Sequence, residues 1–243
     1  FAAESHVQTS IFSNQEFMES NIAGVNNLLH LIKSKPKNTI DRPILFQIST
    51  DEVYGDIEEG LHFENDMLKP SNPYAASKAA ADLLIQASSR TYGIEYIIAR
   101  PTNNYGKNQF PEKLIPLTVK NLLRGKKIKL HDEGQPTRNW LHVDDTVNAI
   151  LKLIEEADRN KIYNISGGFE QKNIDTVKKI IVEFHGNLNN WEDYIDFSFK
   201  RVGQDVRYAI DDNCIRNLGW KPQKNFDSEI KDIVKHYMKN TRW

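Results

Sequence analysis

The sequence predicts an α/β fold in which helices pack against a parallel β-sheet. Residues 44–49 and 94–99 are short apolar runs with the length of buried strands. Two helical stretches precede them, residues 14–35 and the alanine-rich residues 74–92. Residues 1–7 have the character of an earlier strand end and its exit loop. This alternation of strand, helix, strand, helix and strand is typical of a parallel sheet.

The two helical stretches carry further local signals. In residues 14–35 the large apolar side chains fall mostly on one stripe: Phe17, Ile22, Val25, Leu28, Leu29 and Ile32. Pro36 lies just past this stretch, and Gly93 follows the second one as a C-terminal stop. Both helices are therefore expected to end near these two residues.

Beyond Arg100 the elements become shorter and less regular. A loop rich in Asn, Gly and Pro covers residues 101–113. The segments after it predict helices at 114–123, 144–156, 173–184, 212–218 and 226–239, and strands at 127–131, 162–165 and 195–199. In the helix at 144–156 we expect four residues to face inward: Val147, Ile150, Leu151 and Ile154. We expect one domain at residues 1–100 and another at residues 101–243, from which some strands and helices return to the first.

Composition limits the classes of protein that fit. The chain has 243 residues, of which 39% are hydrophobic and 27% charged, as in ordinary globular domains. The net charge of −1 gives no general attraction to nucleic acid or to an anionic membrane. No window approaches the roughly 18 apolar residues of a membrane span, no signal peptide is present, and the single Cys214 fits a reducing compartment. We expect a cytoplasmic protein with neither a membrane nor a nucleic acid as partner.

Two adjacent acids follow the strand at residues 44–49. Ser49 and Thr50 end the strand, and Asp51 and Glu52 come next. Open parallel sheets bind ligands outside the carboxyl ends of their strands, so acids at this place are candidates for proton transfer. The alternative is a polar strand exit that only caps a turn.

Tyr74 and Lys78 begin the alanine-rich helix. Their spacing of four residues puts both side chains on one helix face. A free tyrosine has a pKa of about 10, and a nearby ammonium group favours the phenolate and lowers that pKa. Such a pair can deprotonate an alcohol while a hydride leaves the same carbon, although an isolated pair of this kind is also common on helix surfaces.

These features occur in a fixed order with other short motifs. The first four motifs are FAAESHV at 1–7, STDEVYG at 49–55, NPYAASK at 72–78 and RPTNNYG at 100–106. Later matches lie at residues 110–116, 137–140, 163–165 and 218–222, so they reach nearly to the end of the chain. The set resembles the extended short-chain dehydrogenase/reductase superfamily and, within it, the nucleotide-sugar 4,6-dehydratases.

The resemblance implies a Rossmann-type doubly wound parallel sheet with a smaller α/β C-terminal part that binds substrate. It implies NAD as cofactor, no metal, a sugar nucleotide (dTDP-glucose or UDP-glucose) as substrate, and a homodimer formed through helices such as residues 14–35 and 74–92. In the family a glycine loop cradles the pyrophosphate of NAD about 80 residues upstream of the first motif. That loop and the N-terminal strands are missing from this chain, and we expect that these residues omit them.

The resemblance also implies catalytic roles. Tyr74 takes the proton of the sugar 4-hydroxyl while C4 gives a hydride to NAD, Thr50 hydrogen-bonds the 4-oxygen, and Lys78 lowers the pKa of Tyr74 and holds the nicotinamide ribose. Glu52 then removes the C5 proton, and a protonated Asp51 gives its proton to the departing 6-hydroxyl. Opposite roles for adjacent carboxyls require different surroundings.

Three kinds of function remain open at this point. Related epimerases and decarboxylases usually have a small hydroxyl residue in place of Asp51, so the acid pair favours dehydration over either reaction. A non-catalytic sugar-nucleotide-binding protein is the alternative from a different class.

Further positions match the family's binding residues. Contacts to NAD are implied for Ala2, Ala3, Ser49, Tyr74, Lys78 and Asn103. Contacts to the sugar nucleotide are implied for Ser5, His6, Asn103, Lys113, Leu114, His131, Arg138, Asn173 and Arg207. The two arginines would clamp the diphosphate, which suits bidentate guanidinium chemistry, although each could instead form a surface ion pair.

His131 departs from the bacterial pattern. Bacterial dTDP-glucose dehydratases usually have a tyrosine stacked on the base at this position, whereas histidine occurs in plant UDP-rhamnose synthase domains and in animal dehydratase-like proteins. A thymine methyl adds only a modest apolar contact. The sequence therefore leaves thymidine and uridine nucleotides both open.

Overall fold

The computed structural model describes residues 3–37, 39, 42–198 and 205–240. The chain divides into two compact units, which we describe separately. The first unit contains residues 1–102, 148–165 and 209–221, and the second contains residues 103–147, 166–208 and 222–243. Two segments from the second half of the chain thus belong to the first unit.

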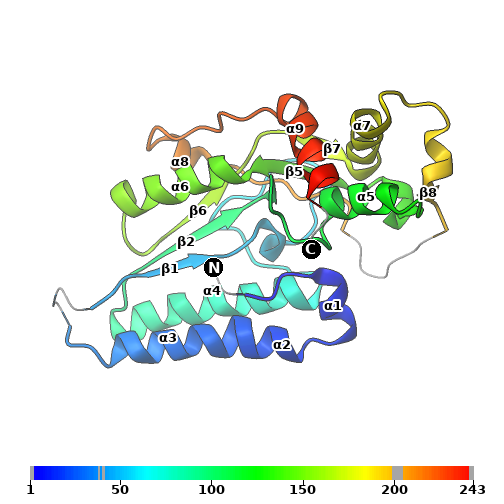
Figure 1. Cartoon of the computed structure of the whole chain (residues 1–243). Helices are drawn as coiled ribbons and strands as arrows, with labels where there is room; N and C mark the ends of the chain where they lie inside the picture. The colour runs from blue at the N-terminus through cyan, green and yellow to red at the C-terminus, as the bar shows by residue number, and fades with distance from the viewer. Residues whose placement is uncertain (1–2, 38, 40–41, 199–204, 241–243) are drawn as a thin grey trace. The chain divides into compact units, whose positions relative to one another are not determined.

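The first unit is built on three parallel strands in the order β1-β2-β6 (Figure 1). Their bounds are Leu45–Ile48 for β1, Tyr96–Pro101 for β2 and Lys161–Ile165 for β6. The register places Leu45 opposite Tyr96, and Ile98 opposite Ile162. Every residue of β2 is buried, as expected for a parallel strand that is covered on both faces. The strands expected at 44–49, 94–99 and 162–165 are confirmed.

Helices cover both faces of this sheet (Figure 1). On one face α3 (Gly24–Lys33) and α4 (Pro73–Tyr92) lie side by side; on the other lie α6 (Val143–Glu156) and α8 (Asn213–Arg216). A buried cluster joins α3 and α4 to the strands and includes Leu29, Ile85 and Ile98. Leu28, expected on the buried stripe, is half exposed instead.

The helical segment before α3 is less regular than expected. It consists of α2 (Gln15–Phe17) and a π-helix, η1 (Met18–Ala23), which runs directly into α3. A separate helix, α1 (Val7–Phe12), precedes it where the sequence suggested a loop. This helix packs against α4, and its Ser10 Oγ accepts from the backbone N–H of Tyr74 at 3.2 Å. Because α1 depends on this tertiary contact, local sequence gave no signal for it.

The second unit contains two small sheets. The first has the order β3-β5-β7, with β3 (Asn103–Tyr105) parallel and β7 (Glu170–Lys172) antiparallel to β5 (Thr137–His142). The second pairs β4 (Ile128–Lys129) with β8 (Ile195–Asp196) in parallel. β4 and β8 were expected, although shorter than predicted, and residue 199 of the predicted strand lies outside the described residues. β3, β5 and β7 were not expected.

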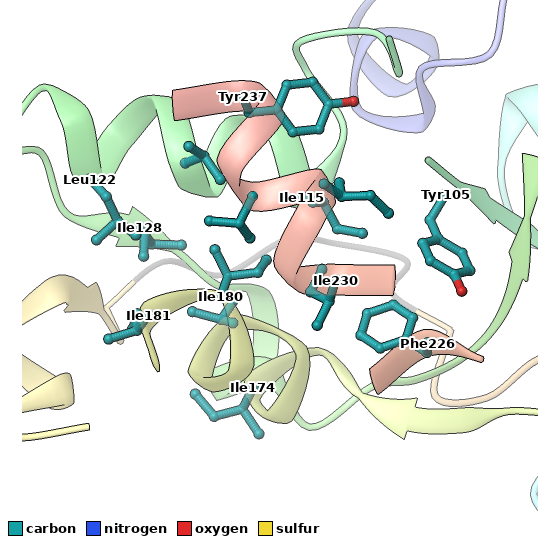
Figure 2. Packing of buried hydrophobic residues seen from close by; sticks show 14 of the residues in the cluster. Tyr105, Ile115, Leu122, Ile128, Ile174, Ile180, Ile181, Phe226, Ile230 and Tyr237 are labelled. Atoms are coloured by element: carbon teal, nitrogen blue, oxygen red, sulfur yellow. The ribbon is translucent and has the colours of Figure 1, made fainter. Parts of the chain in front are cut away.

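Three helices form the core of the second unit (Figure 2). They are α5 (Leu114–Leu123), α7 (Asn173–His185) and α9 (Phe226–Lys239), close to the bounds expected from the sequence. Ile115, Ile180 and Ile230 meet between them. Tyr237 closes one end of this core, since its hydroxyl donates to the carbonyl oxygen of Gly106 at 2.8 Å.

The inward face expected for α6 is mostly wrong. Ile150 is buried, but Val147, Leu151 and Ile154 are each about half exposed. Ala149 and Leu153 are buried in their place. Both sets of apolar residues follow helical spacing, so the pattern alone could not decide which stripe faces inward. In the described part of the chain, no helix has the length and apolar character needed to span a membrane.

Candidate active site

The carboxyl end of β1 leads directly into a tight turn that carries the two acids. The backbone N–H of Ser49 donates to the carbonyl oxygen of Ala99 at 2.7 Å, which keeps the strand exit beside β2. Thr50 then caps a 3-10 helix, η2 (Asp51–Tyr54), because its Oγ1 accepts from the backbone N–H of Glu52 at 3.3 Å. The turn begins as soon as the strand ends, so both carboxyls lie at the ligand-binding edge of the sheet.

Asp51 and Glu52 lie in different surroundings. Asp51 is only 2% exposed, and its Oδ1 accepts from the Thr50 hydroxyl at 3.1 Å. Glu52 is half-buried, and its Oε2 accepts from Asn72 Nδ2 at 3.3 Å. Asn72 also caps α4, where its Oδ1 accepts from the backbone N–H of Ala75 at 2.9 Å. The acidic turn is thus joined to the first residues of α4.

The start of α4 presents Tyr74, Lys78 and Asp82 on one buried face, because they are spaced four residues apart. The phenol of Tyr74 forms a hydrogen bond with the side chain of Thr50. Lys78 Nζ donates to the carbonyl oxygen of Ile48 at 2.6 Å. One helix face therefore reaches both the end of β1 and the turn behind it. The structure brings together all five residues expected to be catalytic.

Burial dominates the electrostatics of this helix face. It raises the pKa of Tyr74, and the negative charges of Glu52 and Asp51 raise it further, whereas the hydrogen bond with Thr50 lowers it. Burial also lowers the pKa of Lys78, although the charge of Asp82 acts in the opposite direction. The net shift at Tyr74 is upward, opposite to the depression expected from Lys78, because a phenolate is poorly solvated here. Tyr74 needs a further positive charge beside it to act as a base at neutral pH.

A cavity of about 200 Å³ lies next to Tyr74 and Lys78. Three other residues expected at the site line it: Ala3, Ser5 and Ser49. Ala2, another expected cofactor contact, lies outside the described residues. His6, expected to contact substrate, lies at the start of α1, where its Nδ1 is 2.6 Å from Thr9 Oγ1.

Asn21 also lines this cavity and was missed by the sequence reasoning. It is buried in the π-helix η1, and its Oδ1 accepts from the backbone N–H of Glu4 at 2.9 Å. Its Nδ2 donates to the carbonyl oxygen of Glu4 at 3.0 Å and to Ser77 Oγ at 2.9 Å. Asn21 thereby joins the N-terminal segment to the Tyr74 end of α4. A π-turn often marks a functional position, but it is visible only in the structure.

In the second unit, the two predicted diphosphate ligands lie on neighbouring segments. Arg207 forms a parallel bridge with Thr137, the residue before Arg138. Arg138 is buried, with its guanidinium carbon 4.7 Å from the ring centroid of Tyr208. Arg207 Nε and Nη2 donate to the two carboxylate oxygens of Glu170 at 2.7 and 3.0 Å. The alternative of an ion pair is therefore real for Arg207, and a diphosphate would have to share or replace Glu170.

The remaining expected substrate residues lie at element ends of the second unit. Asn103 begins β3, Leu114 and Asn173 begin α5 and α7, and His131 begins the 3-10 turn η3 (His131–Gly134). Lys113 caps α5, and its Nζ is 3.6 Å from a Glu112 carboxylate oxygen. The side-chain oxygens of Asn103 and Asn173 are buried and have no hydrogen-bond partner within the described residues. Buried acceptors of this kind are suited to a bound ligand.

Comparisons with known proteins agree with this arrangement. The sequence model of a family described as GDP-mannose 4,6 dehydratase matches residues 1–233. The dTDP-glucose 4,6-dehydratase 1 of Escherichia coli (strain K12) is 40% identical over 263 residues, covering 100% of this chain and 72% of that protein. The crystal structure of DesIV, the dTDP-glucose 4,6-dehydratase from Streptomyces venezuelae with NAD and TYD bound, has a TM-score of 0.92 and 39% identity, covering 100% of this chain and 73% of its own.

A more distant likeness concerns the fold alone. The UDP-glucuronic acid 4-epimerase from Bacillus cereus has a TM-score of 0.87 but only 21% identity, covering 98% of this chain and 74% of its own. Together with the parallel sheet and its helices on both faces, the likeness to DesIV confirms the expected Rossmann-type α/β fold. The chain belongs to the family described as GDP-mannose 4,6 dehydratase, among the nucleotide-sugar 4,6-dehydratases of the extended short-chain dehydrogenase/reductase superfamily.

Proposed function

We propose that this protein is an NAD-dependent lyase that converts a nucleoside diphosphate glucose into its 4-keto-6-deoxy form. The observation that carries this proposal is the meeting of an acid pair with a Tyr–Lys pair. Asp51 and Glu52 lie in the turn after β1, and the Thr50 that caps this turn is hydrogen-bonded to Tyr74. The Tyr–Lys pair suits oxidation of an alcohol, and the acid pair suits elimination of water from the ketone that results.

The cavity beside α4 fits the nicotinamide end of NAD. Its lining offers hydroxyl, carboxamide and ammonium groups from Ser49, Asn21 and Lys78, and Lys78 is already directed to the backbone of β1. We assign Ala3, Ser49, Tyr74 and Lys78 to holding the cofactor. When bound, NAD supplies the hydride acceptor and donor and, in its oxidised form, a positive charge that favours the phenolate of Tyr74.

The oxidation depends on Tyr74, Thr50 and Lys78. Tyr74 takes the proton of the sugar 4-hydroxyl as hydride leaves C4, and Thr50 donates a hydrogen bond to the same oxygen. The 4-keto group then makes the C5 proton acidic. Because Thr50 contacts both Tyr74 and Asp51, it links the oxidation half of the site to the elimination half.

The elimination depends on the two acids. Glu52 removes the C5 proton, and Asp51, as the neutral acid, gives its proton to the departing 6-hydroxyl, so that water leaves across C5 and C6. Their different burial and different hydrogen-bond partners support the division of roles. Hydride return to C6 completes the product and regenerates NAD.

One incubation separates the proposal from its alternatives. We expect the full-length protein to convert dTDP-glucose or UDP-glucose to a product lighter by one water, which mass spectrometry detects. An epimer of unchanged mass, or released carbon dioxide from a uronic acid substrate, would instead indicate an epimerase or a decarboxylase. Binding of either nucleotide without turnover would indicate a non-catalytic protein.

For the base, we propose thymidine over uridine. The relatives of about 40% identity are named dTDP-glucose 4,6-dehydratases, which supports this choice. His131 departs from the tyrosine usual in bacterial relatives, so the preference is expected to be small. The ratio of kcat/KM for dTDP-glucose and UDP-glucose measures it, and a higher value for UDP-glucose would reverse the assignment.

We further propose a homodimer that forms through α3 and α4. Large apolar side chains are exposed along both helices: Leu28 (49%) and Leu31 (55%) on α3, and Leu83 (57%) on α4. A groove of about 250 Å³ lined by Lys33, Leu84 and other residues of the two helices lies on the same unit. Exposed apolar groups that cluster on neighbouring helices favour association.

We also propose a cytoplasmic location. Cys214 is exposed and free, which suits a reducing compartment. Fractionation of cells with an antibody to the protein tests this, and recovery from a secreted or membrane fraction would contradict it.

A further inference from the structure

A fully buried ion pair lies directly beneath the proposed active site. Asp82 of α4 is 0% exposed and Arg100 of β2 is 1% exposed, and Arg100 Nε donates to Asp82 Oδ2 at 3.0 Å. Burying two charges costs several kcal/mol per ion, and only close geometry and further hydrogen bonds offset that cost. A buried pair is therefore a weak source of stability, and its position indicates another role.

The pair holds the first residue of the acidic segment. Asp82 Oδ2 also accepts from the Ser49 hydroxyl at 2.9 Å. Ser49 immediately precedes Thr50, so this bond fixes the point where β1 ends and the turn begins. Asp82 lies on the same helix face as Tyr74 and Lys78, which ties the strand exit to that face.

The same pair holds the last residue of the acidic segment. Arg100 Nη1 donates to the hydroxyl oxygen of Tyr54 at 2.7 Å, and Tyr54 ends the 3-10 turn η2. The Tyr54 hydroxyl in turn donates to Asn164 Oδ1 of β6 at 2.8 Å. Both ends of residues 49–54 are thus fastened to one ion pair, while Thr50, Asp51 and Glu52 lie between the two attachments.

We propose that Asp82 and Arg100 are positioning residues of the reaction, which hold the acidic turn in register with the Tyr74 and Lys78 face of α4. This role rests on the proposed function of those residues. The pair contacts the reacting groups only through Ser49, Tyr54 and the helix, so its loss changes the rate of chemistry and leaves substrate affinity nearly unchanged. A purely structural pair would instead lower thermal stability and leave kcat per folded molecule unchanged.

The test compares kcat and KM for dTDP-glucose in four forms of the full-length protein. Asp82→Asn keeps the shape but removes the charge, and we expect kcat to fall by about 10–100-fold with KM changed by less than about 2-fold. The double variant Asp82→Asn/Arg100→Gln removes both charges, leaves no lone buried charge, and is expected to recover part of kcat. Ile85→Ala is the matched control: Ile85 is also fully buried on α4 but lies in the apolar cluster, so it is expected to lower Tm without lowering kcat per folded molecule.

A milder variant covers the case in which Asp82→Asn does not fold. Tyr54→Phe removes only the hydroxyl that receives the hydrogen bond of Arg100, and we expect kcat to fall by about 3–10-fold at unchanged KM. Folded Asp82→Asn or Tyr54→Phe protein with wild-type kcat overturns the proposal, as does a loss of kcat that the Ile85→Ala control shares. Absence of the dehydrated product with wild-type protein would instead overturn the proposed function itself, and the positioning role with it.

Discussion

At the scale of single residues, the proposed chemistry depends on how differently two adjacent carboxyls are held. Asp51 is buried and accepts from a hydroxyl that also contacts Tyr74, whereas Glu52 is half-buried and accepts from the residue that caps α4. A proton donor benefits from surroundings that favour the neutral acid, and a base benefits from access to solvent and amide donors. The two roles should therefore be separable by substitution.

Replacing Asp51 with Asn removes the proposed proton donor and keeps its size. We expect water loss to slow by about 10²–10³-fold, while hydride transfer from C4 slows far less. Single-turnover experiments separate the steps, since NADH absorbance reports hydride transfer and mass spectrometry reports water loss. Asp56→Asn, an exposed acid just beyond the turn, is the matched control and should leave both steps unchanged. Equal slowing of both steps in Asp51→Asn would remove the assigned role.

Glu52 also acts on Tyr74 through its charge. It is the charged group that raises the pKa of Tyr74 most. Because Tyr74 must lose its proton to act as a base, hydride transfer from C4 should increase as pH rises through that pKa. Glu52→Gln removes the negative charge and lowers the pKa, so the rising limb should move to lower pH. The pH profile of NADH formation in single turnovers measures this.

The control for this shift is Glu58→Gln, because Glu58 is exposed in the loop that follows the turn. Its pH profile should match that of the wild type. A limb that stays in place or moves to higher pH in Glu52→Gln would show that another group than Tyr74 controls the step.

At the scale of elements, the acidic turn depends on the glycine that ends it. Gly55 has φ +84°, and a Cβ there would lie 2.3 Å from the backbone oxygen of Lys69. We expect Gly55→Ala to lower the free energy of unfolding by about 2–5 kcal/mol, since backbone strain and overlap add. Gly60→Ala is the matched control, with φ +82° but nothing within 4 Å of the added methyl, so it should cost only about 1 kcal/mol. Urea unfolding measures both, and equal losses would mean that the overlap is relieved by movement of the loop.

The same elements show what the sequence could and could not predict. β1 and α4 were predictable because a short apolar run and an alanine-rich stretch with an Asn cap and a glycine stop are local signals. The π-turn around Asn21 was not, because its extra residue per turn leaves no mark in composition. α6 was misjudged because two apolar stripes fit the helical period equally well. The short strands β3, β5 and β7 contain polar residues and become strands through their partners.

At the scale of the whole molecule, the catalytic residues were found from ordered motifs, but their support was not. Asp82, Arg100, Tyr54 and Asn164 come from four segments, and the bond from Tyr54 to Asn164 joins positions 110 residues apart. No local pattern predicts such a network, because its partners are chosen by tertiary structure. In the second unit, likewise, the pairing of Arg207 with Glu170 depends on the meeting of two distant segments.

Association is the last property of the whole molecule that can be tested. If α3 and α4 form the interface, placing charge on both helices should separate the subunits, because a buried unpaired carboxylate is strongly unfavourable. We expect Leu31→Glu/Leu83→Glu to have the mass of a monomer by light scattering, under conditions in which the wild type has twice that mass. Leu123→Glu is the matched control, since Leu123 is 42% exposed on α5 and should leave the dimer intact. A dimeric double variant would place the interface elsewhere, and a monomeric wild type would show that the exposed leucines of α3 and α4 do not mediate association.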